Sequence, residues 1–129
     1  MTIRGLSPTP LLSFRDKLKS MKLLRLENAA ETPVSHSPSV KKRVLTKDPI
    51  SCVMHLSHVV LGPGDSAFAH SHKDGFEVFY CASGEAVFRV NGREVPLRDG
   101  DCLVVEPGDL HEITPVRNKV ELFYFFALE

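Results

Sequence analysis

The sequence has little that would direct the chain to a membrane or a nucleic acid. Among its 129 residues it has no tryptophan, and no apolar run approaches the ~20 residues that a membrane-spanning helix needs. Sixteen basic residues balance sixteen acidic ones, so no net field attracts nucleic acid or an anionic membrane surface. We therefore expect neither partner. The length suits one domain with a single core.

Cysteine is also scarce. Cys52, Cys81 and Cys102 are dispersed, odd in number and lack the Cys-x-x-Cys spacing. This pattern argues against a disulfide framework and favours reduced thiols in a cytoplasmic protein. Each cysteine is expected to be a small buried apolar residue rather than a ligand or nucleophile.

What the sequence does contain, from residue 51 onward, is short apolar runs separated by turn residues. Asn91-Gly92 lies between two such runs and is a strong hairpin signal, because both residues tolerate positive φ. Ser83-Gly84 is expected to form another turn. Short strands at regular spacing predict an all-β barrel or sandwich. The expected strands cover residues 50–61, 77–82, 85–90, 93–97, 103–105 and 120–128.

Four residues form a candidate metal-ligand set. His70 and His72 are two positions apart, so on a strand both imidazoles would point to the same face. Glu77 follows five positions later, and His111 ends a second glycine-bounded segment. Three imidazoles and one carboxylate suit a divalent first-row metal. The alternative is a loop of polar surface residues.

The spacing of these residues resembles the cupin family. Its first motif is a glycine, five residues, His-x-His, a glutamate after three or four more, and a glycine after six more. Gly64, His70, His72, Glu77 and Gly84 satisfy every interval.

The second cupin motif runs from a glycine through a strand to Pro-x-Gly-x-x-His. Residues 100–111 follow it with two departures. Glu106 stands where the first proline usually lies, and Pro115 replaces the family's asparagine after the histidine. Neither change affects a ligand, but both alter the loop at the mouth of the site. The resemblance covers roughly residues 50–128.

The resemblance implies a double-stranded β-helix barrel of the cupin or jelly-roll type, formed by residues 50–129. It also implies one divalent metal inside the barrel, bound by His70, His72, Glu77 and His111. This ligand set does not choose among iron, manganese, nickel, copper and zinc.

Residues 1–49 are interpreted as an N-terminal extension that is partly helical. Thr9-Pro10 predicts a helix start, and apolar residues recur at helical spacing to Met21. This basic stretch also fits a transit peptide, and translation starting at Met21 is a further alternative. Residues 32–49 read as a solvated connecting segment with a short strand at Val40 to Leu45.

Other polar and aromatic residues are expected to have lesser roles. His55 and His58 are expected to be satisfied strand histidines, and His36 a loop residue. Glu106 and Tyr80 could act as acid–base groups only if they reach the cavity. The candidates for its apolar wall are Phe68, Phe79, Phe88 and Ile113.

The last expected strand bears on assembly. Leu122, Tyr124 and Phe126 alternate with Phe123 and Phe125, so the two sets lie on opposite faces. One face can fill the barrel, while the other would expose phenylalanines. We predict a homodimer that covers this face, with coverage by the N-terminal segment of a monomer as the alternative.

Two functional classes follow from this site, and both involve a small-molecule ligand. One is a metal-dependent enzyme of the dioxygenase, isomerase or decarboxylase type, acting on a small oxygen-rich substrate with Glu77 as proton acceptor. The other is a non-catalytic cupin that binds or senses a small molecule. The sequence does not decide between them, because one fold hosts both.

Overall fold

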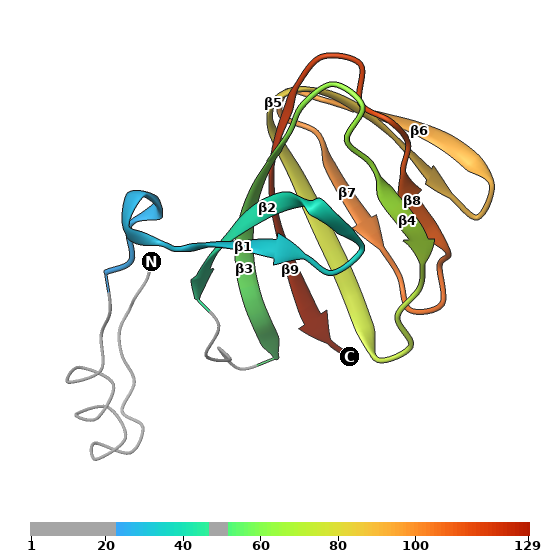
Figure 1. The fold of residues 1–129 in the computed structure, drawn as a ribbon. Helices are drawn as coiled ribbons and strands as arrows, with labels where there is room; N and C mark the ends of the chain where they lie inside the picture. The colour runs from blue at the N-terminus through green and yellow to red at the C-terminus, as the bar shows by residue number, and fades with distance from the viewer. Residues whose placement is uncertain (1–22, 47–51) are drawn as a thin grey trace.

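In the computed structural model of the protein, residues 23–46 and 52–129 are described, and their regular secondary structure is almost entirely β-strand (Figure 1). The predicted all-β class and double-stranded β-helix fold are confirmed. Within these residues, no helix is long and apolar enough to cross a membrane. The elements are η1 (Leu26–Asn28), β1 (Glu31–Val34), β2 (Ser37–Thr46), β3 (Val53–Leu61), β4 (Ala67–His70), β5 (Gly75–Val90), β6 (Arg93–Arg98), β7 (Cys102–Val105), β8 (His111–Ile113) and β9 (Val120–Leu128).

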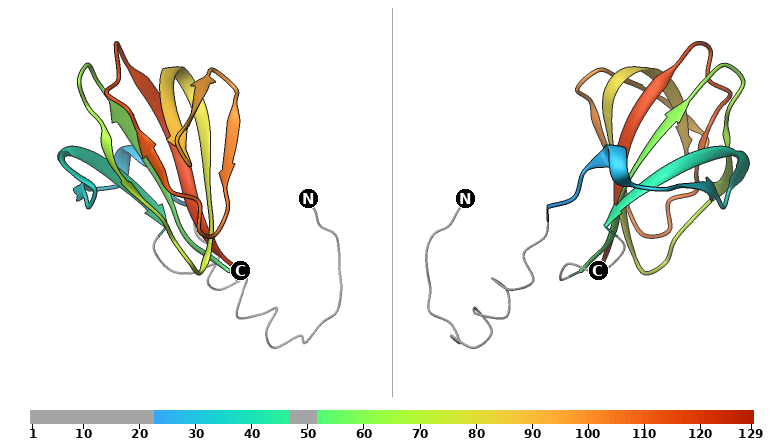
Figure 2. Two further views of the ribbon diagram at one scale, coloured as in Figure 1. Left: turned by 90° about the vertical axis from the view of Figure 1, so that its right-hand side faces the viewer. Right: turned by 60° about the vertical axis from the view of Figure 1, so that its left-hand side comes forward.

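The barrel is built around β5, which belongs to two sheets. Its first half pairs with β9 and β7, and β9 continues through β3 and β2 to β1. Its second half pairs with β6 and β8, and β8 continues to β4. Figure 1 shows β4 and β8 side by side, and Figure 2 shows the sheets from two further directions. A single strand therefore joins the two walls of the barrel.

The predicted turn at Ser83-Gly84 is wrong, because β5 continues through these residues. The register shifts between Cys81 and Ser83, and Gly84 has a φ of 90°. A Cβ at Gly84 would overlap the backbone carbonyl of Lys119. Glycine is needed here because the strand bends from one sheet into the other with β9 in close contact.

The predicted hairpin at Asn91-Gly92 is confirmed. It connects β5 to β6, which pair antiparallel from Val90 and Arg93 outward. Asn91 has a φ of 51° and Gly92 a φ of 81°, as a two-residue turn with two left-handed positions requires.

The hydrophobic core lies between the two sheets. Strand alternation places one side of each strand inward, where aliphatic and aromatic side chains pack against one another. Phe88, Val120 and Leu122 are fully buried. The core consists of Val40, Val59, Leu61, Phe79, Cys81, Ala86, Phe88, Leu97, Val105, Ile113, Val116, Val120 and Leu122.

The N-terminal segment is more ordered than its composition indicated. The predicted short strand at Val40 to Leu45 is part of the longer β2, which pairs with both β1 and β3. The polar composition of this segment did not indicate a long strand, because only one face of β2 has to be apolar. Val40 is buried, whereas Lys41 is exposed. The predicted helix near Thr9-Pro10 and the alternatives at Met21 lie outside the described residues. A division near residue 50 stays a prediction.

The expectation that all three cysteines are buried is wrong for two of them. Cys81 is fully buried, whereas Cys52 and Cys102 are exposed, and all three are free thiols. Cys102 pairs with Tyr80 on the outer side of the sheet, where a small side chain has nothing to pack against.

The position of Gly84 generates a test of the fold. Gly84→Ala should lower the free energy of unfolding by about 2 to 4 kcal/mol, because a left-handed residue with a side chain is strained and the new methyl meets a backbone carbonyl. Gly92→Ala is the matched control. Gly92 also has a positive φ, but a Cβ added there would meet no atom within 4 Å. The Gly92→Ala substitution should therefore cost only about 1 kcal/mol. Urea denaturation of both variants measures the difference, and equal losses would contradict this account of β5.

Candidate metal centre

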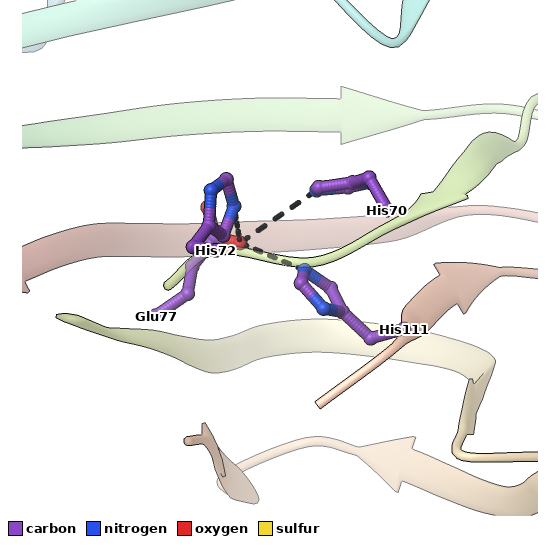
Figure 3. A group of neighbouring side chains, drawn as sticks. All are labelled: His70, His72, Glu77 and His111. Carbon is purple, nitrogen blue, oxygen red and sulfur yellow. Dashed lines mark hydrogen bonds and ion pairs between the residues drawn. The ribbon is translucent and has the colours of Figure 1, made fainter. Parts of the chain in front are cut away.

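The four predicted ligand residues come together at one end of the barrel. His70 ends β4, Glu77 lies in β5 and His111 begins β8, where it pairs in register with His70. One ligand atom from each residue lies within 4.8 Å of the others. Figure 3 shows the four side chains pointing toward one another. We call His70, His72, Glu77 and His111 the His/Glu cluster.

His72 reaches this cluster by a different route from the one predicted. Strand β4 ends at His70, so His72 lies in the loop that follows rather than one pleat along the strand. The carbonyl of His72 accepts a 2.7 Å hydrogen bond from the backbone N–H of Gly108. The His72 ring also packs against Phe126, with centroids 5.1 Å apart. These two contacts orient the imidazole in place of the strand.

One oxygen atom is the centre of the cluster. Oε1 of Glu77 lies 3.0 Å from Nε2 of His111, 3.3 Å from Nε2 of His72 and 4.0 Å from Nε2 of His70. Burial by itself would raise the pKa of Glu77, but the hydrogen bond from His111 and the neighbouring imidazoles outweigh it and lower the pKa. Glu77 is therefore a carboxylate at neutral pH.

Backbone carbonyls orient two of the imidazoles. Nδ1 of His70 lies 2.8 Å from the carbonyl oxygen of Phe68, and Nδ1 of His111 lies 3.0 Å from that of Asp109. Each Nδ1 therefore carries a proton, and each Nε2 is directed to the centre. Burial lowers the pKa of His70 against the effect of the Phe68 carbonyl, which favours the neutral form that binds metals.

His111 differs because both of its nitrogens face oxygen atoms. Its burial opposes the charged form, but the hydrogen bonds to Glu77 and Asp109 outweigh this and raise its pKa. In the metal-free protein, His111 therefore holds a proton between Nε2 and Glu77. A positive charge at this point is part of what stabilises the arrangement.

The loop before His111 is tied to the hairpin at Asn91. The Asn91 side chain donates a 2.9 Å hydrogen bond to the carboxylate of Asp109 and accepts one from the N–H of Leu110. Its backbone N–H also bonds the carbonyl of Leu110 at 2.7 Å. A turn recognised in the sequence only as a hairpin signal thus helps to position a cluster residue.

The donor set fits a metal ion. Nε2 of His72 is buried without a hydrogen-bond partner among the described residues, and its 3.3 Å approach to Glu77 lacks hydrogen-bond geometry. A buried nitrogen of this kind is costly unless it is paired. Three nitrogens and a carboxylate oxygen around one point can bind a divalent first-row metal, and this donor set does not distinguish one such metal from another.

The cluster lies at the wall of a cavity of about 180 Å³, which is partly open to solvent. Two of the predicted apolar wall residues, Phe79 and Ile113, line it. The other two do not: Phe88 is fully buried in the core, and Phe68 is 66% exposed. Glu106 and Tyr80 are exposed and lie outside the lining, so neither is positioned for acid–base chemistry.

Several polar lining residues were not recognised as site residues from the sequence. His36, in the turn between β1 and β2, stacks on His70 with ring centroids 3.8 Å apart. His55 lines the cavity as a strand histidine. His58 does not line it: this histidine is buried elsewhere and pairs with Glu121 at 2.7 Å. Lys42 and Tyr124 also line the cavity. Alternation along β3 and β9 could have indicated His55 and Tyr124, but no sequence signal indicated His36.

A family model described as a cupin domain matches residues 57–124, which is more than half of the chain. The chain belongs to the cupin family. The match begins within β3, ends within β9 and includes the whole His/Glu cluster.

Two relatives share 40% identity with this cupin over 58 residues, or 45% of the chain. One is named the oxalate-binding protein of Thermotoga maritima, and the match covers 48% of it. The other is the tetracenomycin polyketide synthase protein TcmJ of Streptomyces glaucescens, of which 39% is covered. The match thus spans about half or less of the length of these relatives.

Solved structures agree on the fold. A predicted oxalate decarboxylase from Thermotoga maritima aligns with a TM-score of 0.74 at 25% identity, covering 84% of this chain and 100% of that chain. The polyketide cyclase RemF from Streptomyces resistomycificus aligns with a TM-score of 0.72 at 17% identity, covering 84% and 80% of the two chains. An RmlC-like cupin from Shewanella frigidimarina gives a TM-score of 0.71 at 20% identity, covering 85% and 93%.

The coupled pKa shifts predict how the metal-free protein responds to pH. The raised pKa of His111 contributes stability that is present below its ordinary value of 6.5 and is lost as pH rises through the raised value. The lowered pKa of Glu77 contributes stability that is present above 4.5 and is lost as pH falls through the lowered value. Stability from this pair should therefore be greatest between the two ordinary values, 4.5 and 6.5.

Denaturation in the presence of a chelator tests this expectation. The free energy of unfolding should fall from neutral to alkaline pH as His111 loses its proton. In Glu77→Gln that fall should be smaller, because His111 no longer faces a carboxylate. A wild-type profile with the same alkaline slope as the variant would refute the coupling.

Proposed function

We propose that this cupin binds one divalent transition metal through the His/Glu cluster and, next to it, a small ligand with two neighbouring oxygen atoms. One observation supports this most strongly: four ligand atoms lie within 4.8 Å of one another at the wall of an accessible cavity. When bound, the metal would act as a Lewis acid and polarise an oxygen atom of the ligand.

The size of the cavity favours a small acid over a large ring system. Sites for drug-sized molecules usually occupy ~300–1,000 Å³, whereas this cavity has about 180 Å³. The relatives' names mention oxalate and a polyketide. A cavity of this size is better suited to a ligand like oxalate than to a polyketide. We propose a small carboxylic acid, keto acid or enediol as the ligand.

We propose two roles for Glu77: a metal ligand and a proton acceptor. Its lowered pKa makes it a stable anionic ligand and a weak base, because basicity falls with pKa. It can accept a proton from a substrate only after it has separated from His111. We propose that turnover, of the decarboxylase, isomerase or dioxygenase type, requires this carboxylate.

Binding without turnover is the second candidate function. It is favoured by the name of the oxalate-binding relative, which is 40% identical over the matched residues. In that case the His/Glu cluster would hold the metal and its ligand, and Glu77 would remain a ligand throughout.

Metal analysis tests the proposed site. Purified protein should contain about one divalent metal per chain, and His72→Ala should weaken the affinity by about one to two orders of magnitude, because two imidazoles and a carboxylate remain. His58→Gln is the matched control, since it removes a histidine with a carboxylate partner on the outer face. Plasma mass spectrometry and competition with a chelator give the values. Wild-type protein that takes up none of the first-row metals would overturn the assignment.

Ligand binding and turnover are tested with the metal-loaded protein. Small acids and enediols should change its absorption spectrum when iron or copper is present, because they bind at the metal. Glu77→Gln should keep part of its metal and lose any consumption of these compounds, since it retains the shape but not the base. If spectra do not respond to any such compound, the small-acid proposal fails. If they respond but nothing is consumed, the non-catalytic function is the correct one.

We also propose that the chain forms a homodimer through the outer face of β3, β9, β5 and β7. Phe123 and Phe125 are half-buried on this face, and apolar neighbours are more open: Val60 is 41%, Tyr80 46% and Val104 52% exposed. Residues 31–46 extend the sheet at its edge beside β3 rather than lying over this face. Exposed apolar area of this kind favours association.

Sedimentation velocity tests the assembly. The wild-type chain should sediment as a dimer, and Val104→Asp with Tyr80→Asp should shift it toward a monomer, because charges cannot be buried unpaired. Cavity substitutions such as Ile113→Val should leave the sedimentation coefficient unchanged. A wild-type chain that is monomeric at high concentration would contradict the proposal.

A further inference from the structure

The cavity has a second group of polar side chains that the His/Glu cluster does not use. Lys42 lies on β2, His55 on β3 and Tyr124 on β9, and all three line the cavity. They come from the sheet formed by β1, β2, β3, β9 and β5, whereas His70 and His111 come from the opposite sheet. A ligand beside the metal would therefore meet this second group.

Strand register defines how far apart the two groups are. His55 pairs with Phe126, and Phe126 pairs with Glu77, so the three residues form one row across the sheet. Neighbouring strands lie about 4.8 Å apart, which places the backbones of His55 and Glu77 roughly 10 Å from each other. Both side chains line the same cavity, so a molecule of a few carbon atoms in this cavity could contact both ends.

A hydrogen-bond chain orients His55. Its Nδ1 lies 2.9 Å from Oγ of the fully buried Ser57, and the Ser57 side chain also interacts with the hydroxyl of Tyr124. Burial, with the charge of Glu77, raises the pKa of Tyr124 to about 12, so its hydroxyl keeps its proton. Tyr124 can then donate to Ser57, and Ser57 to Nδ1 of His55. This direction leaves the N–H of His55 on Nε2, as a donor for a ligand.

Lys42 adds a positive charge to the same region. It is the one lysine or arginine among the described residues that line the cavity, and it forms no ion pair with a described carboxylate. Both Lys42 and His55 line the same cavity, and the charge of Lys42 adds to the larger effect of burial in lowering the pKa of His55. A divalent metal would outweigh the charge of Glu77, so both ends of the cavity would then attract an anion.

We propose that Lys42 and His55 bind the second carboxylate of a small dicarboxylate whose first carboxylate occupies the metal centre. The ligand class is a short dianion, such as oxalate, malonate or succinate. Ser57 and Tyr124 orient His55 through their hydrogen-bond chain. This inference rests on the proposed function, because the first carboxylate needs the metal.

Isothermal titration of fully metal-loaded protein tests the second carboxylate site. Wild-type protein should bind at least one of oxalate, malonate and succinate more tightly than acetate. Lys42→Met and His55→Leu should each weaken dicarboxylate binding by about tenfold or more, because each removes a charged or charge-assisted hydrogen bond. Acetate binding should change less than twofold, and the metal content should stay the same.

Two further variants separate recognition from a general loss of structure. His55→Gln keeps an amide donor near the position of Nε2 and should restore part of the dicarboxylate affinity. Lys41→Met is the matched control for Lys42→Met, because Lys41 is exposed on the other face of β2. It should bind dicarboxylates like the wild type. Nitrogen NMR of the wild-type protein should find the neutral His55 ring protonated on Nε2.

The results also distinguish this inference from the function on which it rests. If metal-loaded wild-type protein binds none of the acids, the proposed small-acid function fails and the inference fails with it. If it binds dicarboxylates and both Lys42→Met and His55→Leu bind them equally well, the inference alone is wrong. A tenfold loss in Lys41→Met equal to that in Lys42→Met would also overturn it, because the effect would then be one of general charge.

Discussion

The convergence of three imidazoles on one buried carboxylate oxygen is the interaction on which the site depends. Oε1 of Glu77 lies within 4.0 Å of three Nε2 atoms, and such an arrangement is stable only with protons or a metal ion between them. The surrounding contacts maintain this arrangement. The carbonyls of Phe68 and Asp109 orient the rings of His70 and His111. The side chain of Asn91 accepts a hydrogen bond from the loop that precedes His111. The fold thus holds polar groups together that would separate in water.

The bent strand β5 makes this convergence geometrically available. Its first half carries Glu77 in one sheet, and its second half pairs with β8, which carries His111 in the other. The bend requires Gly84, where no side chain fits between β5 and the beginning of β9. Backbone conformation several residues from the cluster therefore determines whether a carboxylate and an imidazole from different sheets can meet.

The cavity is lined both by the His/Glu cluster and by residues that lie outside the matched cupin domain. The His/Glu cluster lies within residues 57–124, which match the cupin domain. His36, Lys42 and His55 precede that stretch, and they come from β2, β3 and the turn before β2. Substitutions at these positions can change the lining of the cavity without moving the His/Glu cluster, because the two sets of residues lie on different elements.

From the sequence by itself, the all-β class, the Asn91-Gly92 hairpin and the membership of the His/Glu cluster could be predicted. Each depends on short-range information: strand alternation, positive φ, or ligand spacing within a motif. The tertiary structure alone decided that β5 passes through Gly84, that Phe68 is exposed, and that His36 stacks on His70. These outcomes depend on which strands become neighbours. Residues far apart in the chain meet through long-range pairing, and no local pattern at His36 or Phe68 encodes the surface that each will face.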